Sequence, residues 1–209
     1  MNSVKKYGIL GFIIRGIGTF LYRIFILFYN KMVLDKISID EKQIMFLSYP
    51  DFSDNSRILY EYMQKEDLFK NYKFVWLYDE TKNCDDKLFS NTVFIKWRSR
   101  YYSGISPKAL LKIMSSKYIF YTHISPTSEI EKNEQQLVIN LWHGCGYKKR
   151  TTKLSSSDNN LFDYALVPGD VFVPIKAEFW ACNEDKVIPI GYPRYDLLFD
   201  KSQDSYRYI

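Results

Sequence analysis

Short apolar runs alternate with helix-like segments along the chain beyond Lys36. Seven of these runs have the length and the branched or aromatic content of buried strands: Ile44–Ser48, Phe74–Leu77, Val93–Lys96, Tyr118–Thr122, Leu137–Leu141, Ala165–Val167 and Val187–Ile190. Continuous apolar strands that alternate with helices are typical of a parallel sheet covered on both faces. The pattern therefore predicts an α/β fold, a Rossmann-like domain with a mostly parallel sheet over residues 37–209.

Three helices are predicted, and two of them have recognisable starting residues. Ser53 or Asp54 can cap a helix that runs through Ile58, Leu59 and Tyr62. A second helix is predicted over Ser106–Met114, with a proline in its first turn, where proline is tolerated. A third is predicted over Val173–Trp180.

Residues 1–36 have a different pattern, dominated by Ile, Leu, Phe and Tyr from Tyr7 to Leu34. Arg15 and Arg23 interrupt this stretch, so no uncharged run approaches the roughly 20 residues that span a bilayer. On a helical wheel the basic residues fall in one half, and an apolar face lies opposite: Leu10, Ile14, Ile17, Leu21, Phe25 and Phe28. This pattern predicts an amphipathic helix on an anionic membrane surface. The alternatives are a core helix of the domain and a single span with snorkelling arginines.

The charge distribution narrows the function classes. The net charge of +5 lies entirely in the first 36 residues, which carry Lys5, Lys6, Arg15, Arg23, Lys31 and Lys36 against Asp35. The rest of the chain is neutral, which argues against a nucleic-acid partner because such a domain needs a basic face. The 3 cysteines are widely spaced and match no zinc pattern. We therefore expect a reducing cytosol and no metal site.

The stretch from Leu137 to Arg150 carries the strongest chemical signal. An apolar strand leads directly into Trp142-His143-Gly144, and Lys148 and Lys149 follow. Ligands of open α/β sheets bind at the carboxyl ends of the strands, so this position suits a base acting on an anionic substrate. The chain has only 2 histidines, His123 and His143, which narrows the choice of base. The alternatives are a structural histidine, a solvated basic loop, and Cys145 as a small turn residue rather than a nucleophile.

Two other strand ends carry polar residues. Ser48–Asn55 follows the first strand and leads into a helix whose backbone N–H groups favour anions. Gly191–Asp196 follows the last strand, and its Arg194 can make a forked contact to phosphate or carboxylate. The alternatives are helix capping by the acidic residues and a structural pair between Arg194 and Asp196 or a similar partner.

Together, the three strand-end motifs resemble the N-terminal half of the CDP-glycerol glycerophosphotransferase family, which comprises teichoic acid primases and polymerases. The segment Ser48–Asn55 matches the first family motif. The matching residues of the second and third motifs are Asn140, Trp142, His143, Gly144 and Lys148, and then Gly191, Pro193, Arg194 and Asp196. The resemblance runs in order from about residue 40 to 200. Cys145-Gly146-Tyr147 and Tyr195 depart from the family pattern.

The resemblance implies one half of a GT-B arrangement. Residues 37–209 would be the acceptor-side domain, and a second, donor-binding domain would follow in family members. It implies that CDP-glycerol binds only when that donor half is supplied. We therefore expect the 209-residue chain alone not to turn over CDP-glycerol.

The resemblance also implies the reaction. An acceptor hydroxyl attacks the β-phosphorus of CDP-glycerol and CMP leaves, with His143 and Asp51 as the catalytic candidates. The implied substrate-binding residues are Asn55, Trp142, Gly144, Lys148, Lys149, Arg194 and Asp196. No cofactor is implied. The acceptor is polyprenyl-linked, which places the protein peripherally on the cytoplasmic face of the bacterial membrane.

Two other functions fit the same residues. One is a non-catalytic, membrane-docked remnant or acceptor-binding module. The other is a half-domain of a ribitol phosphate or sugar transferase. The sequence does not separate glycerol from ribitol, because the residues that read the donor would lie in the second half.

Overall fold

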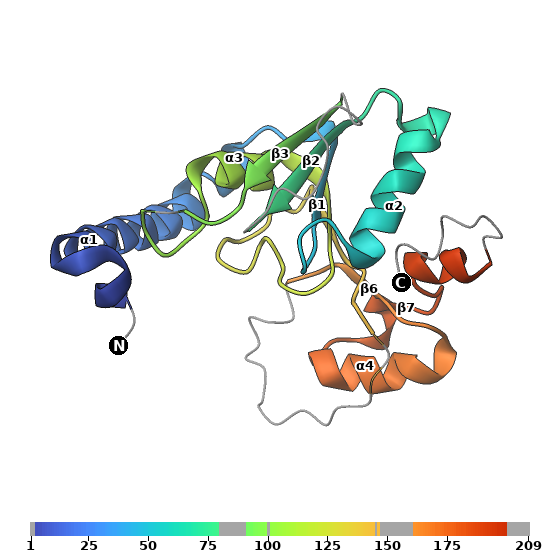
Figure 1. Ribbon diagram of the computed structural model, residues 1–209. Helices are drawn as coiled ribbons and strands as arrows, with labels where there is room; N and C mark the ends of the chain where they lie inside the picture. The colour runs from blue at the N-terminus through green and yellow to red at the C-terminus, as the bar shows by residue number, and fades with distance from the viewer. Residues whose placement is uncertain (1–2, 80–90, 100, 145, 147–160, 200–209) are drawn as a thin grey trace.

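The computed structural model describes residues 3–79, 91–99, 101–144, 146 and 161–199 (Figure 1). Its centre is a sheet of seven strands: β1 (Asp40–Leu47), β2 (Lys73–Tyr78), β3 (Thr92–Lys96), β4 (Ser116–Tyr121), β5 (Leu137–Asn140), β6 (Tyr164–Leu166) and β7 (Val187–Ile188). The strands lie in the order β3-β2-β1-β4-β5-β6-β7, and their pairings are parallel. The predicted α/β fold is confirmed. The last strand is shorter than predicted because Pro189 has no N–H for the ladder.

Four helices surround the sheet in the described residues: α1 (Ser3–Met32), α2 (Asp54–Lys65), α3 (Pro107–Ser115) and α4 (Val173–Trp180). Short 3-10 turns are η1 (Leu34–Lys36), η2 (Asp67–Phe69), η5 (Asp170–Phe172), η6 (Glu184–Lys186) and η7 (Pro193–Leu198). Ser106 caps α3 as predicted, since its side chain accepts from the N–H of Ala109. At α2 the Ser53 side chain makes no cap bond, and Asp54 accepts from the N–H of Asn55 instead.

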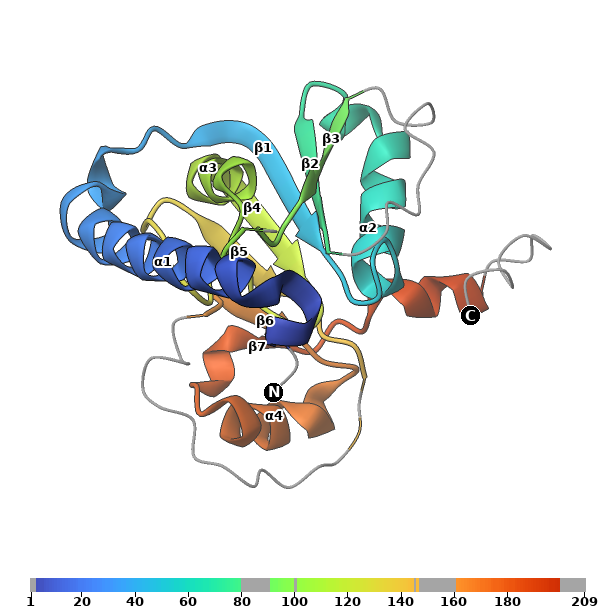
Figure 2. The same ribbon diagram turned by 60° about the vertical axis from the view of Figure 1, so that its left-hand side comes forward.

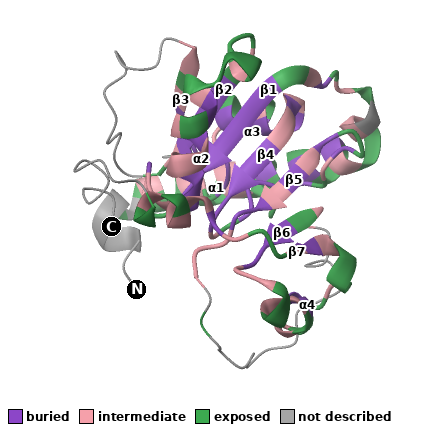
Figure 3. Ribbon diagram, turned by 90° about the vertical axis from the view of Figure 1, so that its right-hand side faces the viewer, coloured by how far each residue is buried: buried purple, intermediate pink, exposed green. Residues whose placement is uncertain are grey.

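Much of β1 is buried (purple in Figure 3), and its side chains alternate between a core on each face of the sheet. Ile44 and Phe46 pack on the α2 side, in a cluster rich in aromatic rings that includes Trp76. Met45 and Leu47 pack on the other side with residues of α1, α3 and α4. Because both faces of β1 are covered over Ile44–Leu47, this part of the strand is a continuous apolar run rather than an alternating one.

The helix α1 lies along the domain beside α3 (Figure 2) and contributes Tyr22, Ile26 and Tyr29 to the core on that face. Tyr22 Oη donates to Glu129 Oε2 at 2.9 Å, and Arg98 binds the other carboxylate oxygen of Glu129. These contacts fix one side of the helix to the domain.

The opposite side of α1 is exposed. The apolar face defined in the sequence, which comprises Leu10, Ile14, Ile17, Leu21, Phe25 and Phe28, lies outside the core. The alternative of a core helix therefore holds only for the side of α1 that carries Tyr22, Ile26 and Tyr29. Leu10–Met32, 23 residues long, is long and apolar enough to cross a membrane by length and composition alone.

Gly104 permits the close approach of α1. A Cβ atom at this position would lie 2.6 Å from Cδ1 and 2.8 Å from Cζ of Tyr22. We expect Gly104→Ala to lower the free energy of unfolding by about 1–3 kcal/mol, because the ring must move or the helix must detach. The matched control is Gly16→Ala, where an added Cβ meets nothing within 4 Å. Urea denaturation that gives the same stability for both variants would contradict this packing.

Candidate active site

The order of the strands reverses between β1 and β4. Moving outward from β1, the chain proceeds through β2 and β3 on one side and through β4 to β7 on the other. In sheets of this kind, ligands bind in the crevice at the carboxyl ends of the strands at the point of reversal. Ser48–Asn55 follows β1, His123 follows β4 and His143 follows β5, so all three segments lie at this crevice.

Asn55 joins the three strand-end motifs. Its side chain, which is fully buried with 0% exposure, lies in the first turn of α2. Its Nδ2 donates to the carbonyl oxygens of Leu141 at 3.2 Å and Trp142 at 2.8 Å, and its Oδ1 accepts from the N–H of Arg194 at 3.1 Å. One amide therefore holds the turn after β1, the turn after β5 and the start of η7 together. It faces backbone rather than open space.

Arg194 forms an ion pair with Asp54. Its Nη1 lies 2.9 Å from Asp54 Oδ1, and the guanidinium is part-exposed. The sequence alternative had suggested Asp196 or a similar partner; the partner is Asp54. The guanidinium has further N–H donors, and because it is part-exposed these can also bond to another group.

The two histidines of the chain meet in this site. The rings of His123 and His143 stack with centroids 3.8 Å apart and planes 9° from parallel. Trp142 packs on the ring of His143 at 4.3 Å, and Tyr49 packs edge-on against His123 at 5.7 Å. The hydroxyl of Thr122 lies 2.9 Å from His123 Nδ1 and orients that ring.

Burial lowers the pKa of both imidazoles below the ordinary histidine value. The neighbouring His123 lowers the pKa of His143 further, and Lys176 and Arg194 act in the same direction. The carboxylate of Asp54 acts in the opposite direction on both rings. The lowered pKa of His143 favours the unprotonated imidazole at neutral pH, which is the state that a general base requires.

Lys176 supplies a buried cation beside the histidines. It lies on α4 with only 4% of its surface exposed, and its Nζ donates to the carbonyl of Gly146 at 3.3 Å. The ammonium lies 5.0 Å from the ring centre of Trp142 and 5.1 Å from that of Phe179. Aromatic faces of this kind stabilise a desolvated cation.

The backbone is strained at the turns that form the site. Phe52, Asp54 and Trp142 have φ angles of 51°, 57° and 54°. Non-glycine residues adopt this left-handed conformation at a cost of about 1–3 kcal/mol each and are enriched at functional sites. The contacts of Asn55 with the Trp142 carbonyl help to hold this conformation.

The other predicted site residues differ in their surroundings. Asp51 Oδ1 accepts from the N–H of Asp79 at 2.9 Å, beyond the end of β2, so this carboxylate bonds to the neighbouring turn. The carbonyl of Gly144 accepts from Tyr192 Oη at 3.0 Å, and an added Cβ at Gly144 would meet nothing within 4 Å. Asp196 is exposed on η7. Lys148, Lys149 and Cys145 lie outside the described residues.

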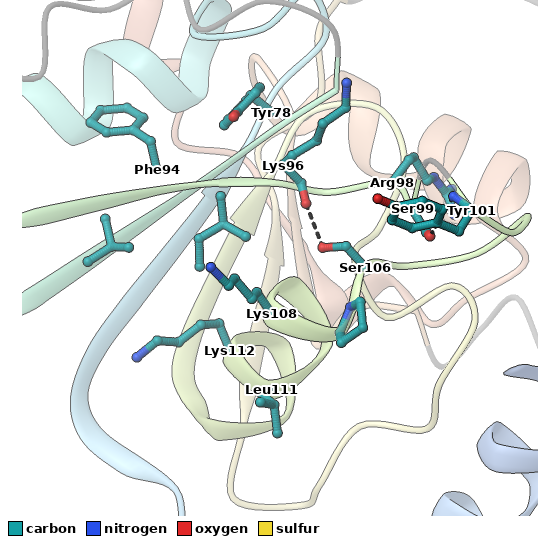
Figure 4. A pocket seen from close by; sticks show the side chains of 13 residues that line it. Tyr78, Phe94, Lys96, Arg98, Ser99, Tyr101, Ser106, Lys108, Leu111 and Lys112 are labelled. Atoms are coloured by element: carbon teal, nitrogen blue, oxygen red, sulfur yellow. Dashed lines mark hydrogen bonds between the residues drawn. The ribbon is translucent and has the colours of Figure 1, made fainter.

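Two cavities are lined by residues other than the histidines. A groove of about 1030 Å³ runs between β3 and α3, lined by Lys96, Arg98, Lys108 and Lys112 among apolar side chains (Figure 4). A smaller apolar cleft of about 400 Å³ lies between α2 and η7 and includes Asp196. In the described part of the chain, no three His, Cys, Asp or Glu side chains gather closely enough to hold a metal ion.

The sequence did not predict a role in the site for three residues: His123, Asp54 and Lys176. His123 was noted only as the second histidine, although it follows the run Tyr118–Thr122 as His143 follows its own strand. Asp54 is predicted as a helix cap and as part of the Ser48–Asn55 motif, without a role of its own in the site. Lys176 shares a helix face with Phe179 and Trp180, which are three and four residues further on, and that spacing was its available signal.

A model of the CDP-Glycerol:Poly(glycerophosphate) glycerophosphotransferase family matches residues 28–209. The chain belongs to this family. Among curated relatives, the teichoic acid poly(glycerol phosphate) polymerase of Staphylococcus epidermidis is 25% identical over 187 residues, covering 80% of this chain and 24% of the polymerase. The teichoic acid ribitol-phosphate polymerase TarL of Staphylococcus aureus is 31% identical over 144 residues, covering 62% of this chain and 25% of TarL.

Solved structures of the family share the fold. A variant of the wall teichoic acid polymerase TagF superposes with a TM-score of 0.67 at 19% identity, covering 91% of this chain and 50% of the TagF chain. The teichoic acid ribitol-phosphate primase of Bacillus spizizenii is 25% identical over 82% of this chain and 45% of its own length. The chain thus spans about half the length of the TagF chain and less than half of these curated relatives.

Proposed function

We propose that residues 37–209 of this glycerophosphotransferase-family chain form the acceptor-side, base-carrying domain of a transferase of teichoic acid synthesis. The observation that carries the proposal is the gathering of His143, Asp54 and Arg194 around Asn55 at the point of strand reversal. The donor is CDP-glycerol, and the acceptor is a lipid-linked hydroxyl. The relatives support this assignment, since they are teichoic acid polymerases and primases.

The proposed reaction is a single displacement at phosphorus. The acceptor oxygen forms a bond to the β-phosphorus of CDP-glycerol, the bond to the CMP oxygen breaks, and CMP carries away that electron pair. His143 takes the proton of the acceptor hydroxyl. Asp54 stabilises the imidazolium that forms, because its carboxylate favours the charged ring.

The remaining residues position the reactants. Asn55 holds the three turns in place without touching substrate, because its amide is buried and bonded to backbone. Arg194 and Lys176 provide positive charge for the phosphoryl oxygens, and Lys148 and Lys149 are further candidates for the same task. Asp51 remains a candidate that shapes the turn after β1.

Ribitol phosphate is the second candidate for the transferred group. Relatives of comparable identity include TarL and a primase, both of which are ribitol-phosphate enzymes. Parallel assays with CDP-glycerol and CDP-ribitol separate the two. Each uses a lipid-linked acceptor and a protein that joins residues 1–209 to a donor-binding half. CMP release dependent on the acceptor supports a transferase, and its absence with both donors contradicts the proposal.

The exposed apolar face of α1 supports a peripheral location on the cytoplasmic surface of the membrane. The helix is fixed to the domain through Tyr22, Ile26 and Tyr29, so its free face is presented at a set orientation. Arg23 and Lys31 are exposed on the same helix and can contact anionic headgroups. A peripheral helix suits an enzyme whose acceptor is attached to a lipid.

We expect the triple variant Ile17→Ser, Leu21→Ser and Phe28→Ser to bind phosphatidylglycerol vesicles at least about 100-fold more weakly in a sedimentation assay. Burial of each of these side chains in the bilayer contributes about 1.5–3 kcal/mol. The control carries Leu68→Ser and Val171→Ser, two exposed apolar residues outside α1. Equal binding by both variants would contradict this surface. Resistance of the wild-type chain to alkaline carbonate extraction would favour a membrane span instead.

A further inference from the structure

The stacked histidines come from different strand ends. His123 follows β4 and His143 follows β5, and these neighbouring strands bring the two imidazoles of the chain face to face at 3.8 Å. The family motif on which the proposed function rests contains His143 alone. His123 therefore lies directly against the proposed base without a role in the reaction described above.

We propose that His123 is a positioning residue for the transfer reaction. It holds the ring of His143 in a fixed orientation and, by opposing a second positive charge in the stack, keeps His143 ready to accept the acceptor proton. This inference rests on the proposed function of His143 as the base.

The geometry excludes a direct proton relay between the rings. The N–H groups of imidazole point outward in the plane of the ring, so two rings stacked with planes 9° from parallel cannot donate to each other. His123 is also fixed at its edges, by the Thr122 hydroxyl at Nδ1 and by the Tyr49 ring. His123 can therefore act on His143 only by packing against its ring in a fixed position and by its charge.

The charges around the stack come from several elements. Asp54 of α2 favours protonation of both rings. His123, Lys176 of α4 and Arg194 of η7 all oppose protonation of His143. The phenol of Tyr49 completes the His123 side. Two imidazolium rings at this separation repel, so the pair takes up its protons in separate steps rather than together.

The two histidines make the test unusually direct. Protein labelled with ¹³C-histidine gives two imidazole signals, which the His123→Phe variant assigns. In the wild-type 209-residue chain we expect both signals to titrate in coupled steps. In His123→Phe, which keeps an aromatic ring, and in His123→Gln, which keeps a polar group, the pKa of His143 should rise because the opposing charge is gone. A His143 pKa that stays the same or falls in both variants would overturn the proposal, provided that the amide spectrum shows an intact fold.

The rate of transfer distinguishes a failure of this inference from a failure of the proposed function. In the transferase assay, His123→Phe should shift the acidic limb of the pH–rate profile to higher pH, because His143 then stays protonated to higher pH. If His143→Asn abolishes transfer while His123→Phe leaves that limb in place, the role of His123 is refuted and the proposed function stands. If the imidazole titrations are coupled but His143→Asn transfers normally, the base assignment fails.

Discussion

Replacement of His143 by Asn, in a protein that joins residues 1–209 to a donor-binding half, is expected to lower the rate of glycerol phosphate transfer by on the order of 10²–10⁴. Asn has a similar size and can donate and accept hydrogen bonds, but it cannot take up a proton at neutral pH. The acceptor should still bind, because Asn55, Arg194 and the surrounding backbone remain in place. The loss should therefore appear in kcat rather than in KM for the acceptor.

The control for this variant is Gln135→Ala, which changes an exposed residue in the segment between β4 and β5. It should leave kcat unchanged. A His143→Asn protein that transfers glycerol phosphate within a few-fold of the wild-type rate would remove His143 from the reaction. Circular dichroism of both variants shows whether the fold is intact.

Asn55→Ala is expected to lower the free energy of unfolding by about 3 kcal/mol or more. The substitution leaves the carbonyls of Leu141 and Trp142 and the N–H of Arg194 without their partner. Each buried polar group left unsatisfied costs about 1–3 kcal/mol. The measurement is urea denaturation of the wild-type chain and the variant.

Two further substitutions sharpen this test. Asn55→Asp keeps the size of the side chain and the acceptor oxygen, but it cannot donate to the carbonyls of Leu141 and Trp142 when ionised, so it should be strongly destabilising as well. Asn183→Ala replaces an exposed asparagine whose side chain makes no cap bond and should change stability little. If Asn55→Ala lowers the free energy of unfolding no more than Asn183→Ala does, the role of Asn55 in holding the three turns together is contradicted.

The fold was predictable because its strands are buried on both faces. A run such as Phe74–Leu77 is apolar throughout, and both of its faces are covered, so the local sequence carries the signal. The start of α3 was predictable for a similar reason, since Ser106 and Pro107 act on neighbouring backbone. Ser53 had the same local signal, but its hydroxyl donates to the carbonyl of Pro50 instead.

The site was predictable to the level of segments, not of contacts. The three motifs follow strands, so their arrival at one edge followed from a parallel sheet. The pairing of Arg194 with Asp54 joins residues 140 positions apart, and the stacking of His123 on His143 depends on the adjacency of β4 and β5. No local pattern encodes such distances. The burial of Asn55, expected in the sequence to meet substrate, also depends on tertiary packing.

Photo-crosslinking of a lipid-linked acceptor to the 209-residue chain tests the location of the acceptor site most directly. The acceptor carries a photoreactive group beside its hydroxyl, and mass spectrometry locates the adducts. We predict adducts in Ser48–Asn55, in the segment 140–146 that contains His143, and in Gly191–Asp196. Adducts confined to the groove between β3 and α3 (Figure 4), or spread over the exposed face of α1 alone, would contradict an acceptor site at the carboxyl edge of the sheet.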